Sequence, residues 1–348
     1  SGTQRFKELF IYQIVIAFVN VLIFVPLVYF FKVPGYFYAF MLFNIISSVS
    51  LAVIAFKPLK SKISLPTKEE FLRIFKEIFS ISVAIYIVKI LYTNWEKLGA
   101  NALGLFNPAE TVAIYSFALL YAKKLMTISD SITTVNIPVF SERYVNNFKE
   151  FRDSFLKNFN KLFSVIVLAG AFASYFAPEI INLLVGGEKY NEALPLIVPM
   201  VFAFVVYSFV NIINSSVLIP AKMAKSMVGS YVLLIVGTIA SFFALKNFTP
   251  MLLSASWAMT IGSSVCLFFM GYWVKKKMGF SVFNLNHIVT ILLSLGISFF
   301  CILETTSIKL MAFIPVFVFL TWILFKFNFL GKDDIFSVRD KLLSLVGK

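Results

Sequence analysis

Residues 194–220, LPLIVPMVFAFVVYSFVNIINSSVLIP, form a stretch without a single charged side chain. About 20 helical residues are enough to cross the ~30 Å hydrocarbon core of a bilayer. This stretch is long enough to do so, and similar apolar stretches recur along the whole chain. We predict ten membrane spans, at residues 11–31, 35–56, 80–105, 111–140, 162–176, 194–220, 226–245, 251–274, 289–303 and 310–325. The expected fold is an all-α polytopic transmembrane bundle.

The composition supports this class. The 348 residues are 59% hydrophobic and only 14% charged, which lies outside the usual range of a soluble globular domain. The net charge of +14 would suggest a nucleic-acid partner in a soluble chain. Here the basic residues lie in short loops between spans, so we expect membrane lipids as partners and no nucleic acid.

The distribution of basic residues predicts the orientation. When the loops are assigned alternately to two sides, 23 of the 31 Lys and Arg fall on the side of the N-terminal segment and four on the other. Basic residues near span ends mark the cytoplasmic side. Both ends of the chain are therefore expected to be cytoplasmic, in a multi-pass protein of the cytoplasmic membrane.

Few residues suggest catalysis or metal binding. Cys266 and Cys301 lie in apolar spans, and His287 lies beside Asn284 and Asn286 at the entrance of a span, where a structural role suffices. The chain has no phosphate-binding glycine loop and no nucleophile elbow. We expect no enzyme activity, no metal and no bound cofactor.

One basic interval divides the chain. Residues 57–68, KPLKSKISLPTK, run into FLRIFKEIF, where Leu72, Phe75 and Phe79 are spaced as on one helical face. We interpret residues 57–79 as a cytoplasmic linker containing an amphipathic helix that lies on the membrane surface.

Two adjacent spans contain all the charged residues that fall inside the predicted membrane region. These are Lys89, Glu96, Lys97, Lys123, Lys124 and Asp130. If the external turn is near Asn107 and Pro108, the two helices are antiparallel, and Lys89 is expected level with Lys123 and Lys124.

These charges have two interpretations. In one, Glu96 with Lys97 and Lys123 with Asp130 are internal pairs of purely structural importance. In the other, four Lys against two acids leave a positive surplus that lipid tolerates poorly. A water-filled cavity that binds an anionic group such as pyrophosphate would accommodate it, because Lys is a point-charge partner of phosphate.

Two passages resemble a known family. WEKLGANALGLFNPAETVAIYSFALLYAKKL, residues 95–125, is similar to an acidic–basic pair, a short turn and an Ala/Gly-x-Tyr-Ser helix start. INLLVGGEKYNEALPLIVPM, residues 181–200, followed by AKMAK at 221–225, is similar to a Leu-x-Gly-x-x-Tyr-x-x-Ala external segment and a small-residue turn. In these passages the chain resembles the O-antigen type polysaccharide flippases of the multidrug/oligosaccharidyl-lipid/polysaccharide exporter superfamily.

The resemblance implies a plan for the chain. Family members have two six-helix lobes and two further C-terminal helices, so this chain would hold spans five to fourteen and lack the first four. Residues 1–56 would end the first lobe, 57–79 link the lobes, 80–277 form the second lobe, 278–328 form the accessory helices, and 329–348 form a cytoplasmic tail. The missing helices, or other membrane proteins of polysaccharide assembly, would be partners.

By the same resemblance, the substrate is a polyprenyl-pyrophosphate-linked oligosaccharide. Lys89, Asn94, Lys97, Lys123 and Lys124 are expected to line the pyrophosphate cavity, while Glu96 and Asp130 pair with them or bind a coupling H⁺ or Na⁺.

Four other functions are alternatives to an oligosaccharide flippase. A flippase for a lipid-linked peptidoglycan precursor would also bind pyrophosphate. A cation-coupled multidrug exporter of the same superfamily would need an acidic cavity. A glycosyltransferase or polymerase would need a large external loop, and a scaffold would not need surplus Lys in its spans.

Overall fold

The computed structural model describes residues 6–56, 67–185, 192–303 and 306–331. Helices are the only regular secondary structure in these ranges. The chain divides into two compact units, Ser1–Glu77 and Ile78–Lys348. Residues 57–66 of the predicted linker and most of the predicted tail lie outside the described residues.

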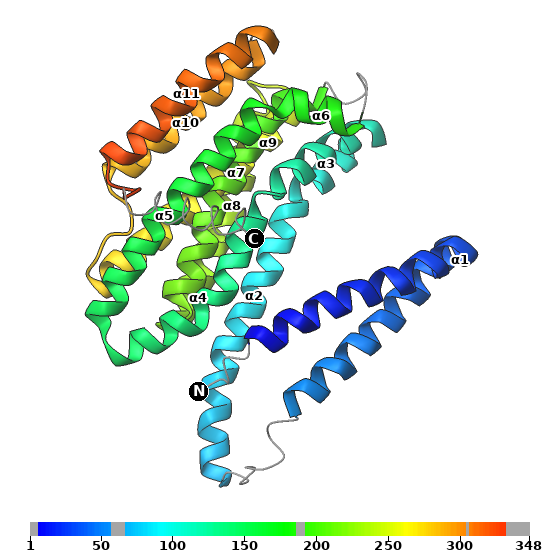
Figure 1. Ribbon diagram of the computed structural model, residues 1–348, viewed down its shortest axis with the longest axis vertical. Helices are drawn as coiled ribbons and strands as arrows, with labels where there is room; N and C mark the ends of the chain where they lie inside the picture. Colours follow the sequence, from blue (N-terminus) through cyan, green and yellow to red (C-terminus); the bar gives the residue numbers. More distant parts are fainter. Residues whose placement is uncertain (1–5, 57–66, 186–191, 304–305, 332–348) are drawn as a thin grey trace, which may run out of the picture. The chain divides into compact units, whose positions relative to one another are not determined.

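The first unit consists mainly of α1 (Phe6–Phe56), a hairpin of two helical arms (Figure 1). The chain reverses at Lys32, whose φ of 52° and ψ of −127° are not helical. Gly35 follows, and a Cβ added there would overlap the carbonyl oxygen of Leu27. The Tyr12 hydroxyl donates to the Ser47 carbonyl at 2.9 Å and joins the arms. The arms correspond to the predicted spans 11–31 and 35–56.

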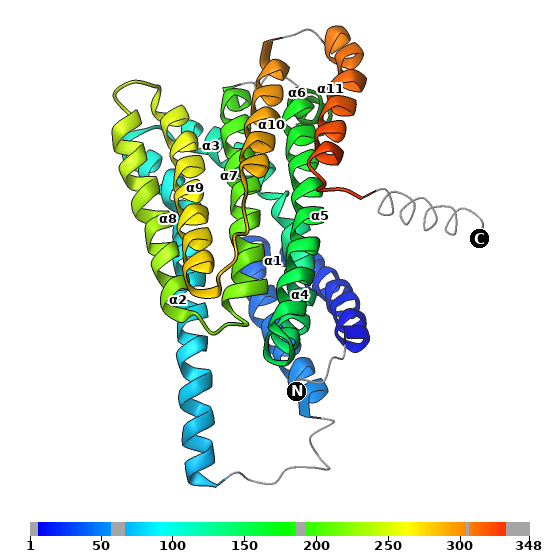
Figure 2. The ribbon, with the colours of Figure 1, turned by 90° about the vertical axis from the view of Figure 1, so that its left-hand side faces the viewer.

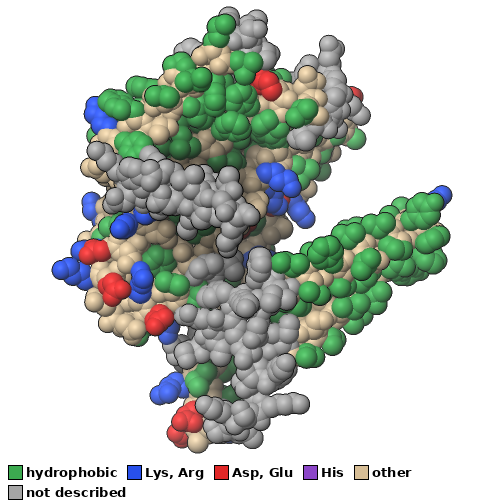
Figure 3. Space-filling model, in the orientation of Figure 1, with side chains coloured by type: hydrophobic (Ala, Val, Ile, Leu, Met, Phe, Trp, Pro, Cys, Tyr) green, Lys and Arg blue, Asp and Glu red, His purple; other side chains and the backbone are tan. Residues whose placement is uncertain are grey.

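The surface of this hairpin is apolar. The most apolar 18-residue window within its Ile14–Val53 stretch contains no buried residue, and of the whole stretch only Gly35 and Ala39 are buried among the residues described. Hydrophobic side chains cover most of both arms in Figure 3. Exposing such a surface to water would be energetically unfavourable, whereas bilayer lipid is as apolar as these side chains. The hairpin therefore fits a membrane environment.

Helix α2 (Lys68–Phe106) begins with a reciprocal cap. The Glu70 amide donates to Thr67 Oγ1 at 3.3 Å, and the Thr67 amide donates to Glu70 Oε2 at 3.0 Å. No Gly or Pro interrupts the sequence from there to Gly99. Residues 68–79 therefore continue directly into the span, which differs from the separate surface helix expected for the linker.

The second unit is a helical bundle built around α7. Besides the rest of α2, its helices are α3 (Ala109–Lys123), α4 (Met126–Asn146), α5 (Phe148–Tyr175), α6 (Ala177–Val185), α7 (Leu194–Ile213), the π-helix η3 (Asn214–Leu218), α8 (Ala224–Leu245), α9 (Met251–Met278), α10 (Leu285–Leu303) and α11 (Thr306–Lys326). Helix α7 packs against α3, α4, α5 and α9. With η3 it forms a stretch in which 94% of the apolar window is buried.

Two antiparallel pairs complete this unit. Helices α8 and α9 pack against each other and are joined by a short turn, as Figure 2 shows. Helices α10 and α11 form a hairpin against α5. This hairpin corresponds to the two predicted accessory spans, 289–303 and 310–325.

The prediction of a polytopic all-α membrane protein is confirmed. Each of the ten predicted spans is mainly helical, although 111–140 is broken at Lys124 and Leu125 and 194–220 ends in a turn after Leu218. Six helices of the described residues are long and apolar enough to cross a membrane, and a bent pair formed by α3 and α4 brings the number to seven. The two arms of α1 count once among these, the apolar part of α10 is short, and α2, which contains the predicted span 80–105, is not one of the seven.

Proline affects two predicted helix ends differently. Helix α4 continues through Pro138 to Asn146. After α7, the helix widens into η3 before Pro220. Single π-helical turns of this kind are rare and often lie at functional sites.

Candidate functional site

The site lies where α2 meets α3 and α4. Helix α2 ends at Phe106 and α3 begins at Ala109, with Pro108 as its N-cap, so the predicted turn at Asn107 and Pro108 is present. The chain then bends by 44° between the segments Ala109–Lys123 and Met126–Thr133. Lys123 is the last residue of α3, directly at this bend.

An ion pair joins the two sides of the site. Lys123 Nζ donates to Glu96 Oε1 at 2.5 Å, and the two side chains are 39% and 16% exposed. Glu96 therefore pairs with a lysine of another helix and not with its neighbour Lys97. Lys123 forms its ion pair with Glu96 and also interacts electrostatically with Asp130. The pairing of Glu96 with Lys97 is therefore wrong, whereas the pairing of Lys123 with Asp130 stays a prediction.

This pair fixes the register of the two antiparallel helices. One turn further along, the Tyr92 hydroxyl lies 3.2 Å from the sulfur of Met126. Continuing this register by two turns from Glu96 brings Lys89 level with Asp130. The prediction that Lys89 lies level with Lys123 and Lys124 is therefore shifted by about two turns.

Three predicted lysines are exposed. Lys89 and Lys97 project from α2, and Lys124 lies at the bend after α3. None of the three forms an ion pair with an acidic residue of the described ranges. Asn94 is also exposed, and its amide donates to the Ile90 carbonyl at 2.8 Å.

The exposed polar residues of α2 share one face. Lys89, Thr93, Lys97 and Asn101 recur every four residues, and each is exposed. On the other side of the site, Lys124, Thr127 and Asp130 are exposed as well. A membrane helix with such a polar face is stable only against protein or water, because lipid cannot solvate it.

Asp130 is held by a residue that sequence reasoning did not assign to the site. Asn211 of α7 donates to Asp130 Oδ1 at 2.8 Å, and its amide also lies 3.5 Å from Ser129 Oγ. Asn211 is one of few polar residues in the apolar stretch of α7, which is a signal for an intramembrane hydrogen bond.

Aromatic residues form the buried wall behind Glu96. The rings of Tyr92 and Trp95 stack on Tyr207 with centroids 4.8 and 5.0 Å apart. The Tyr207 hydroxyl is 3.0 Å from that of Tyr231, and Trp95 Nε1 donates to Thr238 Oγ1 at 3.0 Å. These contacts fix α2 against α7 and α8 and so hold the charged face of α2 in a defined position.

A line of polar side chains continues from the site toward the other end of α4. Asn136 donates to Ser216 Oγ of η3 at 3.3 Å, and Asn158 of α5 donates to Asn136 Oδ1 at 3.4 Å. Beyond them, His287 is buried and lies 3.1 Å from Asn160 and 2.6 Å from Asn284. His287 thus has hydrogen-bonding partners on both ring nitrogens, as a structural histidine does.

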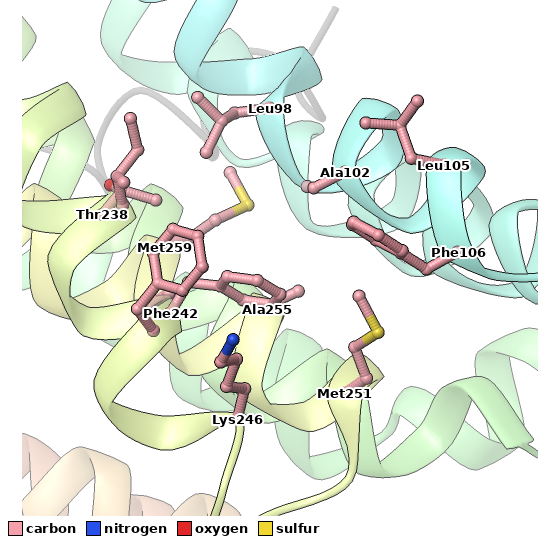
Figure 4. Close-up of a pocket in the computed structure, with 14 residues that line it drawn as sticks. Leu98, Ala102, Leu105, Phe106, Thr238, Phe242, Lys246, Met251, Ala255 and Met259 are labelled. Carbon is pink, nitrogen blue, oxygen red and sulfur yellow. The ribbon is translucent and has the colours of Figure 1, made fainter.

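A cavity of about 660 Å³ lies on the other side of α2, between α2, α8 and α9. Its lining is apolar apart from Thr238 and Lys246, as Figure 4 shows. None of the predicted site residues lines it. This cavity is therefore separate from the charged site.

The described residues contain no group of three His, Cys, Asp or Glu side chains placed to hold a metal ion. Cys266 is buried in α9, and the Cys301 side chain lies outside the described residues.

Comparison with known protein families gives one match. The family model described as "Polysaccharide biosynthesis protein" matches residues 2–195, more than half of the chain. The matched region includes Glu96, Lys123 and Asp130 and ends at the start of α7. The searches of curated proteins and of solved structures found no match.

Proposed function

This chain belongs to the polysaccharide biosynthesis protein family, and on that premise we propose that it is a flippase for a polyprenyl-pyrophosphate-linked oligosaccharide. The observation that supports this function best is the exposure of Lys89, Lys97 and Lys124 within the predicted spans 80–105 and 111–140, where none of them forms an ion pair with an acidic residue of the described ranges. Removing a charged residue from water to mid-bilayer costs roughly 2.5–3.5 kcal/mol. Three such lysines therefore favour a water-filled cavity.

The chemistry of the site suits a pyrophosphate. A Lys ammonium attracts phosphate oxygens without imposing a fixed geometry, which is useful for a headgroup that must bind and then leave. The Glu96–Lys123 pair adds no net charge, so the positive surplus of this face comes from the exposed lysines. Asn94 adds an amide whose carbonyl oxygen accepts no hydrogen bond from the described residues and would contact sugar hydroxyls.

Glu96 and Asp130 are the proposed groups for ion coupling. Each carboxylate has a partner whose contact protonation would weaken, Lys123 for Glu96 and Asn211 for Asp130. Binding of H⁺ or Na⁺ would change these contacts at the bend between α3 and α4, where a change of helix direction is easiest. We further propose the cytoplasmic membrane as the location, with both ends of the chain cytoplasmic, and the remaining helices of the transporter as a partner.

Cysteine accessibility tests the proposal. Cys266 and Cys301 are replaced, and single cysteines are placed at Lys89, Lys97 and Lys124 of the full chain. Vesicles of both orientations are treated with a membrane-impermeant thiol reagent, with and without a lipid-linked oligosaccharide. Labelling that the oligosaccharide blocks supports a flippase cavity.

A matched control uses Lys225, an exposed basic residue of the first turn of α8. Its cysteine variant is expected to label from one side only and without protection. Absence of labelling at all three lysines from both sides, or labelling that the oligosaccharide never changes, would contradict the proposal. Protection by a lipid-linked peptidoglycan precursor in place of the oligosaccharide would assign the alternative substrate.

A further inference from the structure

A second large cavity lies between α9 and α10, away from the α2 lysines. This α9–α10 pocket has a volume of about 610 Å³ and is lined mainly by apolar residues, among them Val206, Leu267, Phe268, Ile288, Ile291 and Leu292. That volume is typical of a site that encloses a small ligand or a segment of one. In a membrane protein, the apolar ligand available to such a pocket is a lipid chain.

One end of the pocket is basic. Lys275 lines it together with Tyr272 and Ser281, and the next residues of α9 are Lys276 and Lys277. All three lysines are exposed, and none forms an ion pair with an acidic residue of the described ranges. No acidic residue lines the pocket. We refer to Lys275, Lys276 and Lys277 as the lysine cluster.

Of the lysine cluster, Lys275 lines the pocket, and Lys276 and Lys277 lie beside it on the last turn of α9. Lys277 Nζ donates to Ser226 Oγ at 3.0 Å and lies 5.2 Å from the centroid of the Trp273 ring. Lys276 Nζ is 5.5 Å from the ring centroids of both Tyr272 and Trp273. Aromatic rings beside basic residues are typical of the membrane interface. The cluster therefore lies at headgroup level, with the apolar pocket extending from it toward the bilayer.

Lysines at a helix C-terminus also stabilise the helix dipole, and that role alone would need no pocket. The pocket is a separate feature, and Gly271 contributes to it. A Cβ added at Gly271 would meet only Phe283 Cδ2 at 3.8 Å, so this wall has room for a larger side chain. The combination of an open apolar pocket with a basic rim matches an amphiphilic anion.

We propose that the α9–α10 pocket binds one acyl chain of an anionic phospholipid whose phosphate contacts the lysine cluster. Basic pockets between membrane helices on the cytoplasmic side bind anionic lipid headgroups, and each basic residue near an anionic surface contributes about 1 kcal/mol. The cluster belongs to the side that the charge distribution marks as cytoplasmic. The site is independent of the proposed flippase cavity, because it contains no residue of α2, α3 or α4.

The test measures the melting temperature of the full chain in neutral detergent during titration with phosphatidylglycerol. A parallel titration uses phosphatidylcholine with the same acyl chains. Phosphatidylglycerol is expected to raise the melting temperature at lower concentration than phosphatidylcholine. Lys275→Gln should increase the half-maximal concentration about fivefold, and replacement of all three lysines by Gln should increase it on the order of 100-fold.

Two variants test the pocket itself without changing charge. Gly271→Leu fills it from α9 and Leu292→Trp fills it from α10. Each is expected to remove the difference between the two lipids. Lys246→Gln, at the rim of the α2–α8–α9 cavity, is the control and should behave as the unmodified chain does.

Three results would overturn the proposal: equal shifts with both lipids, an unchanged titration after loss of the lysine cluster, or a normal titration in whichever filled variant folds. Stabilisation by a lipid-linked oligosaccharide and not by phosphatidylglycerol would also overturn it. No transport is measured, so failure here would leave the flippase proposal untouched.

Discussion

Glu96 and Lys123 are separated by 26 residues, yet their charged atoms lie 2.5 Å apart where the chain bends by 44° between α3 and α4. The pair ties the middle of α2 to the last residue of α3. It neutralises two of the charges in this region and leaves the others exposed. Its integrity should therefore affect the stability of the second unit as well as the site.

Glu96→Gln and Lys123→Gln are each expected to destabilise the protein by roughly 1–2 kcal/mol, because each leaves a half-buried charge without its partner. The exchange Glu96→Lys with Lys123→Glu should recover part of this loss. Melting temperatures in detergent measure the effect. If the single variants and the exchange variant all melt at the temperature of the unmodified chain, the pair contributes nothing to stability.

Lys97→Gln and Lys89→Gln should leave the melting temperature unchanged and weaken binding of a lipid-linked oligosaccharide about tenfold each. Both side chains are exposed without an ion pair, whereas a charge-assisted contact with phosphate contributes ~1.5 kcal/mol or more. Binding is measured by protection of a cysteine at Lys124. Lys225→Gln is the matched control. Normal binding by both α2 variants would exclude Lys89 and Lys97 from the binding site.

Asn211→Asp is expected to be more harmful than Asn211→Ala. It places a second carboxylate against Asp130, and like charges at hydrogen-bonding distance repel. Combining Asn211→Asp with Asp130→Asn restores an amide–carboxylate pair and should recover the melting temperature. If the combined variant is as unstable as Asn211→Asp alone, the 2.8 Å contact is not important for stability.

Gly99→Ala should destabilise the protein by about 1–3 kcal/mol. An added Cβ would overlap the Tyr115 hydroxyl, and Tyr115 is fully buried against α9. Gly104→Ala is the control on the same helix, since its Cβ would lie 3.8 Å from Val112 Cγ2. That change should be neutral or slightly stabilising, because Ala has the higher helix propensity. Similar melting temperatures for the two variants would contradict the predicted overlap.

Most of the helices were predictable from the sequence. A charge-free run such as 194–220 has few alternatives to a membrane helix, and Pro108 after Asn107 has the features of a turn. The concentration of charge in two adjacent spans was also visible, because charged residues are rare in apolar segments.

The partners of these charges were not predictable. Glu96 has Lys97 beside it in sequence, and only the register of α2 against α3 brings it to Lys123. The contact between Asp130 and Asn211 joins residues 81 positions apart, and no local pattern encodes it. The continuity of α2 from Lys68 also depends on tertiary context, since an amphipathic helix can lie on a membrane or extend from it.

The burial of α7 bears on how the protein is made. The helix is almost entirely enclosed, and α9 and α10, which pack against it, follow it in the chain. During synthesis α7 leaves the insertion machinery before these neighbours have been made. It is therefore surrounded first by lipid and, in the folded protein, by other helices. Its apolar sequence therefore allows it to enter the bilayer before its neighbours are present. Its final position depends on shape, as where Val205 packs so closely on Gly170 that no Cβ would fit between them.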